Sequence, residues 1–294
     1  MPPNAPASPP WQVYKFGGTS LATPDRIEHV ASLISDAPEA RVAVVVSAMS
    51  GVTDRLLALT DAAQQDGAAL DERLHALRDD QRSAVTDLLG GTAAPPVLQA
   101  LDDDIGDLAD VLQAARLMGT APDVTRDLVA GYGELWSARL LGGVLRDRGA
   151  DMAVCDAREV LVVTHGDLGP VVDWEATRAR FADWHGAHEA ADGIVATGFI
   201  AATPNGVPTT LGRNGSDHSA ALFAALLDAE ALTIWTDTDG VMSADPRYVP
   251  DAQRLDALSY EEAMEMAYFG AGVIHPRTLA PAIEHEIPLT IRST

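Results

Sequence analysis

The stretch Val13-Tyr14-Lys15-Phe16-Gly17-Gly18-Thr19-Ser20 places a lysine at the end of a short apolar strand, followed by two glycines and two hydroxyl residues. Glycines let the backbone approach a polyanion closely and turn its N–H groups toward it. Lys15 adds a positive charge at the same point. The stretch therefore predicts a strand that ends in a phosphate-binding turn, although Gly17-Gly18 alone is equally typical of a plain turn.

A helix is predicted directly behind this turn. Thr23 can cap the helix N-terminus, and Pro24 suits the first helical position. A helix N-terminus behind a glycine-rich turn favours bound anions. The pattern differs from a Walker A loop, in which the lysine follows the glycines.

The composition indicates a globular protein. The chain has 294 residues, a length that suffices for one or two domains. Of these residues 47% are apolar, which is ordinary for a globular protein. No apolar run reaches the ~20 residues that cross a membrane, and the Pro-rich N-terminus lacks a signal-peptide pattern. We expect residues 1–10 to be a flexible leader. The single cysteine, Cys155, excludes an internal disulfide, fits a reducing cytoplasm and is expected to be buried and inert.

The charge of the chain restricts its partners. With 43 acidic and 20 basic residues the formal net charge is −23, which argues against nucleic acid and anionic membranes. Such a field also repels phosphates, so a phosphate site must be locally basic or bring a metal ion. An acidic surface is typical of a protein that works at high salt. The alternative interpretation is an ordinary, well-solvated surface.

Apolar runs that alternate with helical periods predict an α/β fold. The runs typical of buried parallel strands are residues 42–46, 152–155, 194–197 and 232–235. The segments with helical period are 27–34, 55–64 and 219–227. Such alternation favours a mainly parallel sheet with helices on both faces.

Two other segments have patterns of their own. Residues 68–119 are rich in Leu, Ala, Asp and Arg and predict helices, with a break at 90–96. Residues 199–211 contain Pro204-Asn205-Gly206 between two short β-prone runs, which predicts a hairpin.

Two polar segments are candidates for ligand contacts. Residues 47–53 are rich in hydroxyl side chains and follow a predicted strand, whose carboxyl end is where ligands bind in open α/β sheets. Gly131-Tyr132-Gly133-Glu134 puts two glycines into a helix at ~1 kcal/mol each, which close packing or a ligand would justify. Glu134 could take a ligand amine. An ordinary turn and a solvated glutamate are the alternatives.

Gly212-Arg213-Asn214-Gly215-Ser216-Asp217 suggests an amino-acid clamp. The guanidinium of Arg213 can bind a carboxylate or phosphate, and Asp217 can bind an ammonium. Alternatively, Asp217 is only an acidic residue in the first turn of a helix.

The C-terminal third offers weaker signals. Thr236-Asp237 ends a strand with a polar turn, which can bind a ribose or a metal, and Arg247 can reach phosphates. Residues 269–276 contain glycines that would let the backbone approach a neighbouring group closely. His275 and His218 are expected to be structural rather than catalytic.

Together and in this order, these segments resemble the aspartate kinases of the amino-acid-kinase family. The match runs from about residue 13 to 294, and the segment 212–217 with 258–263 looks most like the kinase part of bifunctional aspartokinase–homoserine dehydrogenases. The resemblance implies a three-layer α/β/α sandwich around a mainly parallel sheet. An amino-acid-binding lobe would span about 11–200 and a nucleotide-binding lobe about 201–294.

The resemblance also implies a reaction and a set of site residues. ATP, with Mg²⁺, would phosphorylate the side-chain carboxylate of L-aspartate to give 4-phospho-L-aspartate, the first step toward lysine, threonine and methionine. The catalytic positions are Lys15 and Asp217. The aspartate-binding positions are Ser47, Thr53, Glu134, Arg213 and Ser216. The nucleotide-binding positions are Lys15, Gly17, Gly18, Thr236, Asp237, Met242, Arg247, Gly272 and Val273.

The sequence departs from the family in places. Gly272 stands where the family usually has a lysine that reaches toward the phosphates, and Met242 replaces a frequent tyrosine. Regulatory domains are absent, so we expect a trimmed catalytic domain or a naturally short enzyme. A homodimer, and fusion in a full-length protein to regulatory and homoserine dehydrogenase domains, are options. Rival interpretations are another amino-acid kinase, such as a glutamate or acetylglutamate kinase, and a nucleotide-binding sensor without turnover.

Overall fold

A single parallel sheet forms the centre of the molecule. The computed structural model describes residues 9–37, 41–65, 67–167, 169–238, 240–244, 249, 251–268 and 276–294. Within them, six strands pair in the order β10-β9-β1-β2-β6-β3, and every pair is parallel. The strands are β1 (Trp11–Phe16), β2 (Arg41–Val46), β3 (Met152–Cys155), β6 (Gly193–Thr197), β9 (Ala231–Thr236) and β10 (Leu289–Ser293). The predicted strands are confirmed as β2, β3, β6 and β9.

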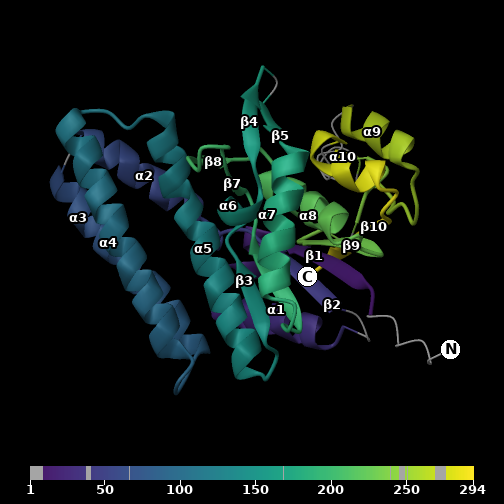
Figure 1. Cartoon of the computed structure of the whole chain (residues 1–294), viewed down its shortest axis with the longest axis horizontal. Coiled ribbons are helices and arrows are strands. Elements are labelled where there is room, and N and C mark those ends of the chain that lie inside the picture. Colours follow the sequence, from purple (N-terminus) through teal and green to yellow (C-terminus); the bar gives the residue numbers. More distant parts are fainter. Residues whose placement is uncertain are drawn as a thin grey trace.

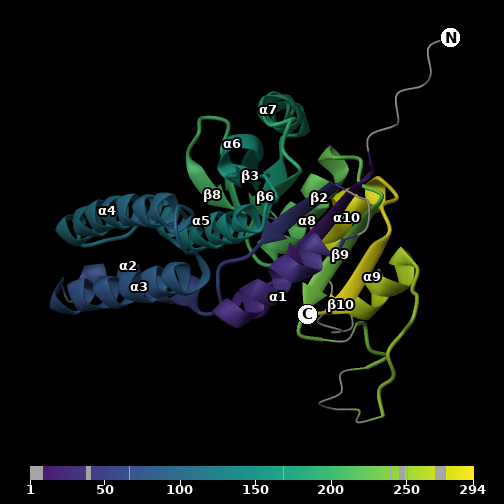
Figure 2. The ribbon, with the colours of Figure 1, turned by 90° about the horizontal axis from the view of Figure 1, so that it is seen from below.

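Helices cover both faces of this sheet, as Figures 1 and 2 show. Val44 and Val46 of β2 pack into one core cluster with Ile27 of α1 (Pro24–Ser35). Val45 of the same strand joins the other cluster with Phe223 of α8 (Gly215–Leu226). Because neighbouring residues of a strand point to opposite faces, the two clusters are the two interfaces of a three-layer α/β/α fold.

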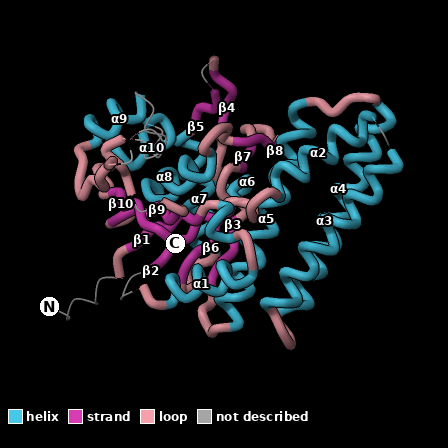
Figure 3. Tube along the Cα trace, turned by 180° about the vertical axis from the view of Figure 1, so that it is seen from behind, coloured by secondary structure: helices cyan, strands magenta, loops and turns pink. Residues whose placement is uncertain are grey.

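A helical arm projects from one side of the sheet (Figures 1 and 3). It consists of α2 (Val52–Gln65), α3 (Gly67–Leu88), α4 (Ala94–Met118) and α5 (Asp123–Asp147). The predicted break between two helices is confirmed between α3 and α4. Helix α5 runs from the arm back to the sheet, and both core clusters include its side chains.

Shorter elements complete the chain. The predicted hairpin is confirmed as β7 (Ile200–Ala202) and β8 (Pro208–Thr210), whereas the hairpin of β4 (Val163–Gly166) and β5 (Gly169–Val172) was not expected. The remaining helices are η1 (Gly18–Leu21), α6 (Ala157–Val160), α7 (Trp174–Ala187), α9 (Tyr260–Tyr268) and α10 (Pro276–Glu284).

Local predictions can be checked at several points. The Thr23 hydroxyl accepts a hydrogen bond from the Arg26 N–H at 3.4 Å, and Pro24 is the first helical residue, so the predicted helix start is confirmed. Cys155 is buried, and burial raises the pKa of its thiol. Across the part of the chain that the structure describes, no helix is both long and apolar enough to cross a membrane.

Some predictions fall outside the described residues. The proposed leader is outside them except for its last two positions. The nucleotide-site candidates Arg247, Gly272 and Val273 and the histidine His275 are also outside.

Candidate active site

A cavity of about 450 Å³ opens at the carboxyl ends of the central strands. The turns that follow β1, β2 and β6 reach it, together with α5 and the start of α8. Parallel α/β sheets bind ligands at this edge. The structure brings most of the predicted site residues together in the lining: Lys15, Gly18, Ser47, Thr53, Glu134, Arg213, Ser216 and Asp217.

An ion pair in the cavity joins Lys15 and Asp217. Lys15 Nζ lies 2.7 Å from Asp217 Oδ1, and the two side chains are 12% and 20% exposed. Lys15 is the penultimate residue of β1, and Asp217 lies in the first turn of α8. Besides being an acidic residue in the first turn of α8, Asp217 is therefore placed where it can orient Lys15.

Lys15 is also the only lysine of the sequence, and all the other basic residues among the 20 are arginines. Arginine and lysine are not interchangeable, because an ammonium is a compact point charge and a guanidinium is a broad planar fork. A chain that uses arginine everywhere else keeps lysine at the end of β1. Its single lysine is a signal that a count of lysines would have revealed from the sequence.

Glu134 is buried in the cavity wall, and no positive group of the described residues pairs with it. Its residue is 3% exposed, and burial raises the pKa of its carboxyl to about 8, against a smaller lowering effect of the hydrogen bond from the Ala48 N–H. Among the described residues, Glu134 Oε2 has no hydrogen-bond partner. Buried polar groups are normally hydrogen-bonded, so this carboxyl has an unused position that a ligand cation such as an ammonium group can fill.

Two glycines allow the walls of the cavity to approach one another. A Cβ on Gly18 would lie 2.8 Å from the Ala48 carbonyl oxygen, and a Cβ on Gly133 would lie 2.7 Å from the Ala48 Cβ. Of the two explanations for the helix glycines, close packing is therefore the one that the structure supports at Gly133. It brings α5 against the turn after β2, which carries Ser47.

Hydroxyl and cationic groups complete the lining. Ser47 Oγ donates to Ser216 Oγ at 2.8 Å, which links the turn after β2 to the start of α8. Arg213 is exposed at the cavity. Asn214 behind it has φ +57°, the left-handed conformation that asparagine tolerates.

Sequence reasoning missed Phe199, which also lines the cavity. It has φ +66°, rare for a bulky residue, and such strain concentrates at functional sites. The backbone is held there because the Phe199 N–H donates to Ser219 Oγ at 3.0 Å and its carbonyl accepts from the Leu211 N–H at 2.7 Å. Its place directly after a buried strand was the available signal. Asp54 was missed as well, whereas Ser50 belongs to the predicted segment 47–53.

The remaining nucleotide-site candidates lie elsewhere. Thr236 ends β9 and donates from Oγ1 to Asp237 Oδ1 at 3.2 Å. Met242 forms an isolated bridge with Arg254. None of Gly17, Thr236, Asp237 and Met242 lines the cavity described above.

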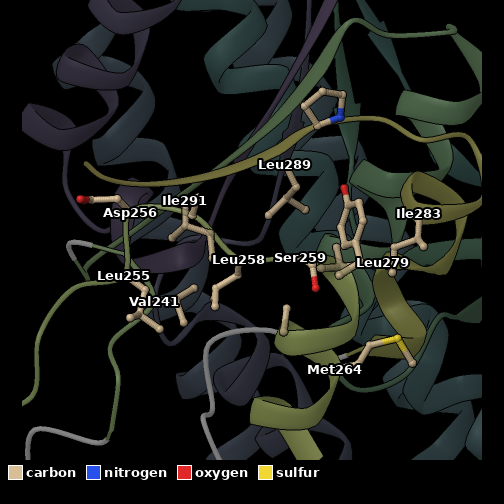
Figure 4. Close-up of a pocket in the computed structure, with 14 residues that line it drawn as sticks. Val241, Leu255, Asp256, Leu258, Ser259, Met264, Leu279, Ile283, Leu289 and Ile291 are labelled. Atoms are coloured by element: carbon tan, nitrogen blue, oxygen red, sulfur yellow. The ribbon is translucent and has the colours of Figure 1, made fainter.

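A second cavity, of about 300 Å³, lies beside this C-terminal region and has a mostly apolar lining. Figure 4 shows Leu289 and Ile291 of β10 on one side and Met264 of α9 on another. Val241, the residue before Met242, also lines it. The two cavities share no lining residue.

Comparisons with known proteins cover nearly all of the chain. The bifunctional aspartokinase/homoserine dehydrogenase 1, chloroplastic, of Arabidopsis thaliana is 44% identical over 291 residues, which are 99% of this chain and 32% of that protein. The lysine-sensitive aspartokinase 3 of Escherichia coli is 36% identical over 283 residues, 96% of this chain and 61% of that protein. This chain thus spans about a third of the plant relative's length.

Structural and family comparisons agree. The crystal structure of E. coli aspartokinase III in complex with aspartate and ADP has a TM-score of 0.86 to this chain at 33% identity, covering 96% of this chain and 61% of that one. The model of the amino acid kinase family matches residues 10–293. The expected resemblance and fold are confirmed, and the chain belongs to the amino acid kinase family.

Proposed function

We propose that this chain transfers the γ-phosphoryl group of ATP to the side-chain carboxylate of L-aspartate. The observation that carries the proposal is one cavity that holds the Lys15–Asp217 pair and a buried, unpaired Glu134. The printed names of the relatives, and the aspartate and ADP in the complex of the E. coli enzyme, support it.

The reaction needs positioning and charge stabilisation rather than a base. A free aspartate side chain has a pKa of ~3.9 and is already ionised at neutral pH. The task is to bring two anions together in line. Lys15 would stabilise the charge of the transferring group, and Asp217 would hold Lys15 in place. The N–H groups at Gly17-Gly18 would add further donors.

The amino acid would be recognised through its charged backbone groups. Its ammonium would pair with Glu134 and satisfy the orphan Oε2, while Arg213 would bind the α-carboxylate. Ser47, Thr53 and Ser216 would donate or accept at the remaining oxygens. A free amino acid fits this set better than an acylated one, because acylation removes the cation that Glu134 requires.

Mg²⁺ fits the charge of the site. The cavity balances Lys15 and Arg213 against Asp54 and Asp217, so it is not locally basic. Nowhere among the described residues does a group of three or more His, Cys, Asp or Glu form a cage for a metal ion. Mg²⁺ is usually held by substrate phosphates with one or two carboxylates, and Asp237, exposed after β9, is the residue that we assign to it. The bound ion would screen the phosphate charge.

The setting of the domain is also a proposal. We propose that a longer protein joins it to regulatory and homoserine dehydrogenase domains, as the names of the plant relatives suggest. A homodimer, a cytoplasmic location and a role in lysine, threonine and methionine synthesis belong to the same proposal. Gly17, Thr236, Met242, Arg247, Gly272 and Val273 keep their proposed nucleotide contacts.

A coupled assay for ADP release tests the function, with aspartate, glutamate or no acceptor. We expect ADP release with aspartate but not with glutamate or without an acceptor. The product should be acid-labile, and hydroxylamine should trap it as the aspartyl hydroxamate. Release with glutamate would identify another amino-acid kinase. Nucleotide binding without release under all three conditions would identify a sensor and contradict the proposal.

Variants of Lys15 test its role in the same assay. We expect Lys15→Ala to lower turnover by ~10²–10³-fold, the usual effect of losing one preorganised charge donor. Lys15→Arg keeps the charge but replaces the ammonium, so it should also lose most activity. Arg55→Ala, which breaks only the exposed pair with Asp80, is the matched control and should behave as the parent chain. Near-normal turnover of Lys15→Ala would remove this residue from the mechanism.

A further inference from the structure

Thr294, the residue after β10, is hydrogen-bonded to two turns at the carboxyl edge of the sheet. Thr294 Oγ1 lies 2.7 Å from Ser20 Oγ, and its N–H donates to the Thr236 carbonyl oxygen at 2.9 Å. His29 Nε2 of α1 lies 2.8 Å from the main-chain oxygen of Thr294. We call Ser20, His29, Thr236 and Thr294 the Thr294 junction. Figure 2 shows the C-terminal end of the chain beside α1 and β10.

The chemistry of the groups fixes the direction of these hydrogen bonds. Thr294 Oγ1 also lies 3.3 Å from the Thr236 carbonyl oxygen, which can only accept, so the threonine hydroxyl donates there. Its single proton is then used, and Ser20 Oγ must donate to Thr294 Oγ1. For the same reason, His29 donates from Nε2. The Thr294 hydroxyl is therefore both an acceptor and a donor in one chain from Ser20 to Thr236.

The junction is built into the protein rather than resting on its surface. Ser20 is 1% exposed, and its N–H donates to the Gly17 carbonyl oxygen at 3.0 Å. It lies in η1, directly after the glycine turn. Thr236 is the last residue of β9 and precedes Asp237. The hydroxyl of Thr294 thus connects the turn after β1 with the turn after β9, neighbouring strands whose pairing ends at Phe16 and Trp235.

We infer that Thr294 is a positioning residue for the nucleotide half of the active site. It sets the distance between the glycine turn, which would receive the transferring phosphoryl group, and the Thr236–Asp237 turn, which would receive the nucleotide and its metal. The aspartate half is built from other segments: Ser47 after β2, Glu134 on α5 and Arg213 before α8. The inference rests on the proposed function, because it assigns Thr294 to one of that reaction's two substrates.

The test compares Thr294→Val, which keeps the shape and removes the hydroxyl, with Thr294→Ser, which restores it. We expect Thr294→Val to raise the KM for MgATP by ~3–10-fold, the effect of a lost hydrogen-bond relay, and to weaken MgADP in a calorimetric titration similarly. The KM for aspartate should change less than about twofold. Thr294→Ser should return both values to those of the parent chain. Thr290→Val, on an exposed position of the preceding strand β10, is the matched control.

A double-mutant cycle provides an independent check. Ser20→Ala removes the first donor of the relay, so it should reproduce the MgATP defect, and Ser20→Ala with Thr294→Val should be no worse than either alone. If Thr294→Val fails to fold, Ser20→Ala and Thr294→Ser carry the test.

Two results would overturn the inference. One is a Thr294→Val variant that is indistinguishable from Thr290→Val, and the other is an equal rise in both KM values that follows a lower melting temperature. An inactive parent chain would contradict the proposed function instead, and the MgADP titration would still report on the junction.

Discussion

In the ligand-free protein, burial disfavours the ionised form of the Glu134 carboxyl. The wall of the cavity removes its carboxyl from water, and its only described hydrogen bond to another residue comes from the Ala48 N–H. The unfolded chain ionises this carboxyl near 4.5 and the folded protein near a pKa of about 8. Below pH 4.5 both states hold the proton. As the pH rises from 4.5 to 8, only the unfolded state releases it, so Glu134 progressively lowers the free energy of unfolding across that range.

Glu134→Gln should therefore stabilise the free protein and impair the enzyme. The melting temperature of the variant should equal that of the parent near pH 4.5 and exceed it increasingly up to pH 8, because glutamine has no proton to lose. The KM for aspartate should rise at least tenfold, since the ammonium loses its partner. Thermal unfolding at pH 4.5, 6 and 8 and steady-state kinetics measure both.

Glu189→Gln is the matched control, because Glu189 is exposed. It should follow the pH dependence of the parent chain. Aspartate itself should raise the melting temperature of the parent more than that of Glu134→Gln. A melting temperature of Glu134→Gln that falls relative to the parent at pH 8 would mean that Glu134 is ionised and paired in the free protein.

At the scale of elements, helix α5 connects the arm to the active site. It carries Glu134, and its approach to the turn after β2 depends on Gly133, where a Cβ would meet Ala48 Cβ at 2.7 Å and Val52 Cγ1 at 3.2 Å. The Ala48 Cβ, the nearer of the two, cannot move away without moving its backbone. Because Gly133 has no Cβ, α5 can come close enough to this turn to place the Glu134 carboxylate in the cavity.

Gly133→Ala should push α5 away from this turn. We expect the free energy of unfolding to fall by ~1–3 kcal/mol, as for other overpacked cores, and the KM for aspartate to rise more than that for MgATP. Urea unfolding and kinetics with each substrate varied measure the two effects. Gly106→Ala in α4, where the added Cβ would meet nothing within 4 Å, should instead gain ~0.5–1 kcal/mol. Equal gains in the two variants would show that α5 is free to shift.

The success of sequence reasoning at this scale followed the strength of the local signal. The runs that became β2, β3, β6 and β9 are continuous and apolar because their strands are covered on both faces. The hairpin β4–β5 carries no such signal, because it lies outside the main sheet and pairs only with itself among the described residues. The sequence assigned Lys15 and Asp217 to one site, but the orphan Oε2 of Glu134 and the φ of Phe199 depend on tertiary packing, which local patterns do not contain.

At the scale of the whole molecule, the net charge of −23 opposes compaction. Added salt screens this repulsion, since the Debye length falls from ~30 Å at 0.01 M to ~10 Å at 0.1 M. We expect the melting temperature to rise over that range in NaCl. Measuring it also in KCl separates screening, which is common to both salts, from specific ion binding. A melting temperature that is constant or falls would show that the repulsion is already balanced by local pairs.

Cleavage at the single lysine of the chain can measure how often the sheet opens. A protease specific for lysine has one bond to cut, between Lys15 and Phe16, and Phe16 is 0% exposed in a strand paired on both sides by β2 and β9. The cut requires β1 to leave the centre of the sheet. Its rate therefore measures how often β1 is released, without a label or a mutation, and a ligand that binds the folded site should slow the cut in proportion to its occupancy.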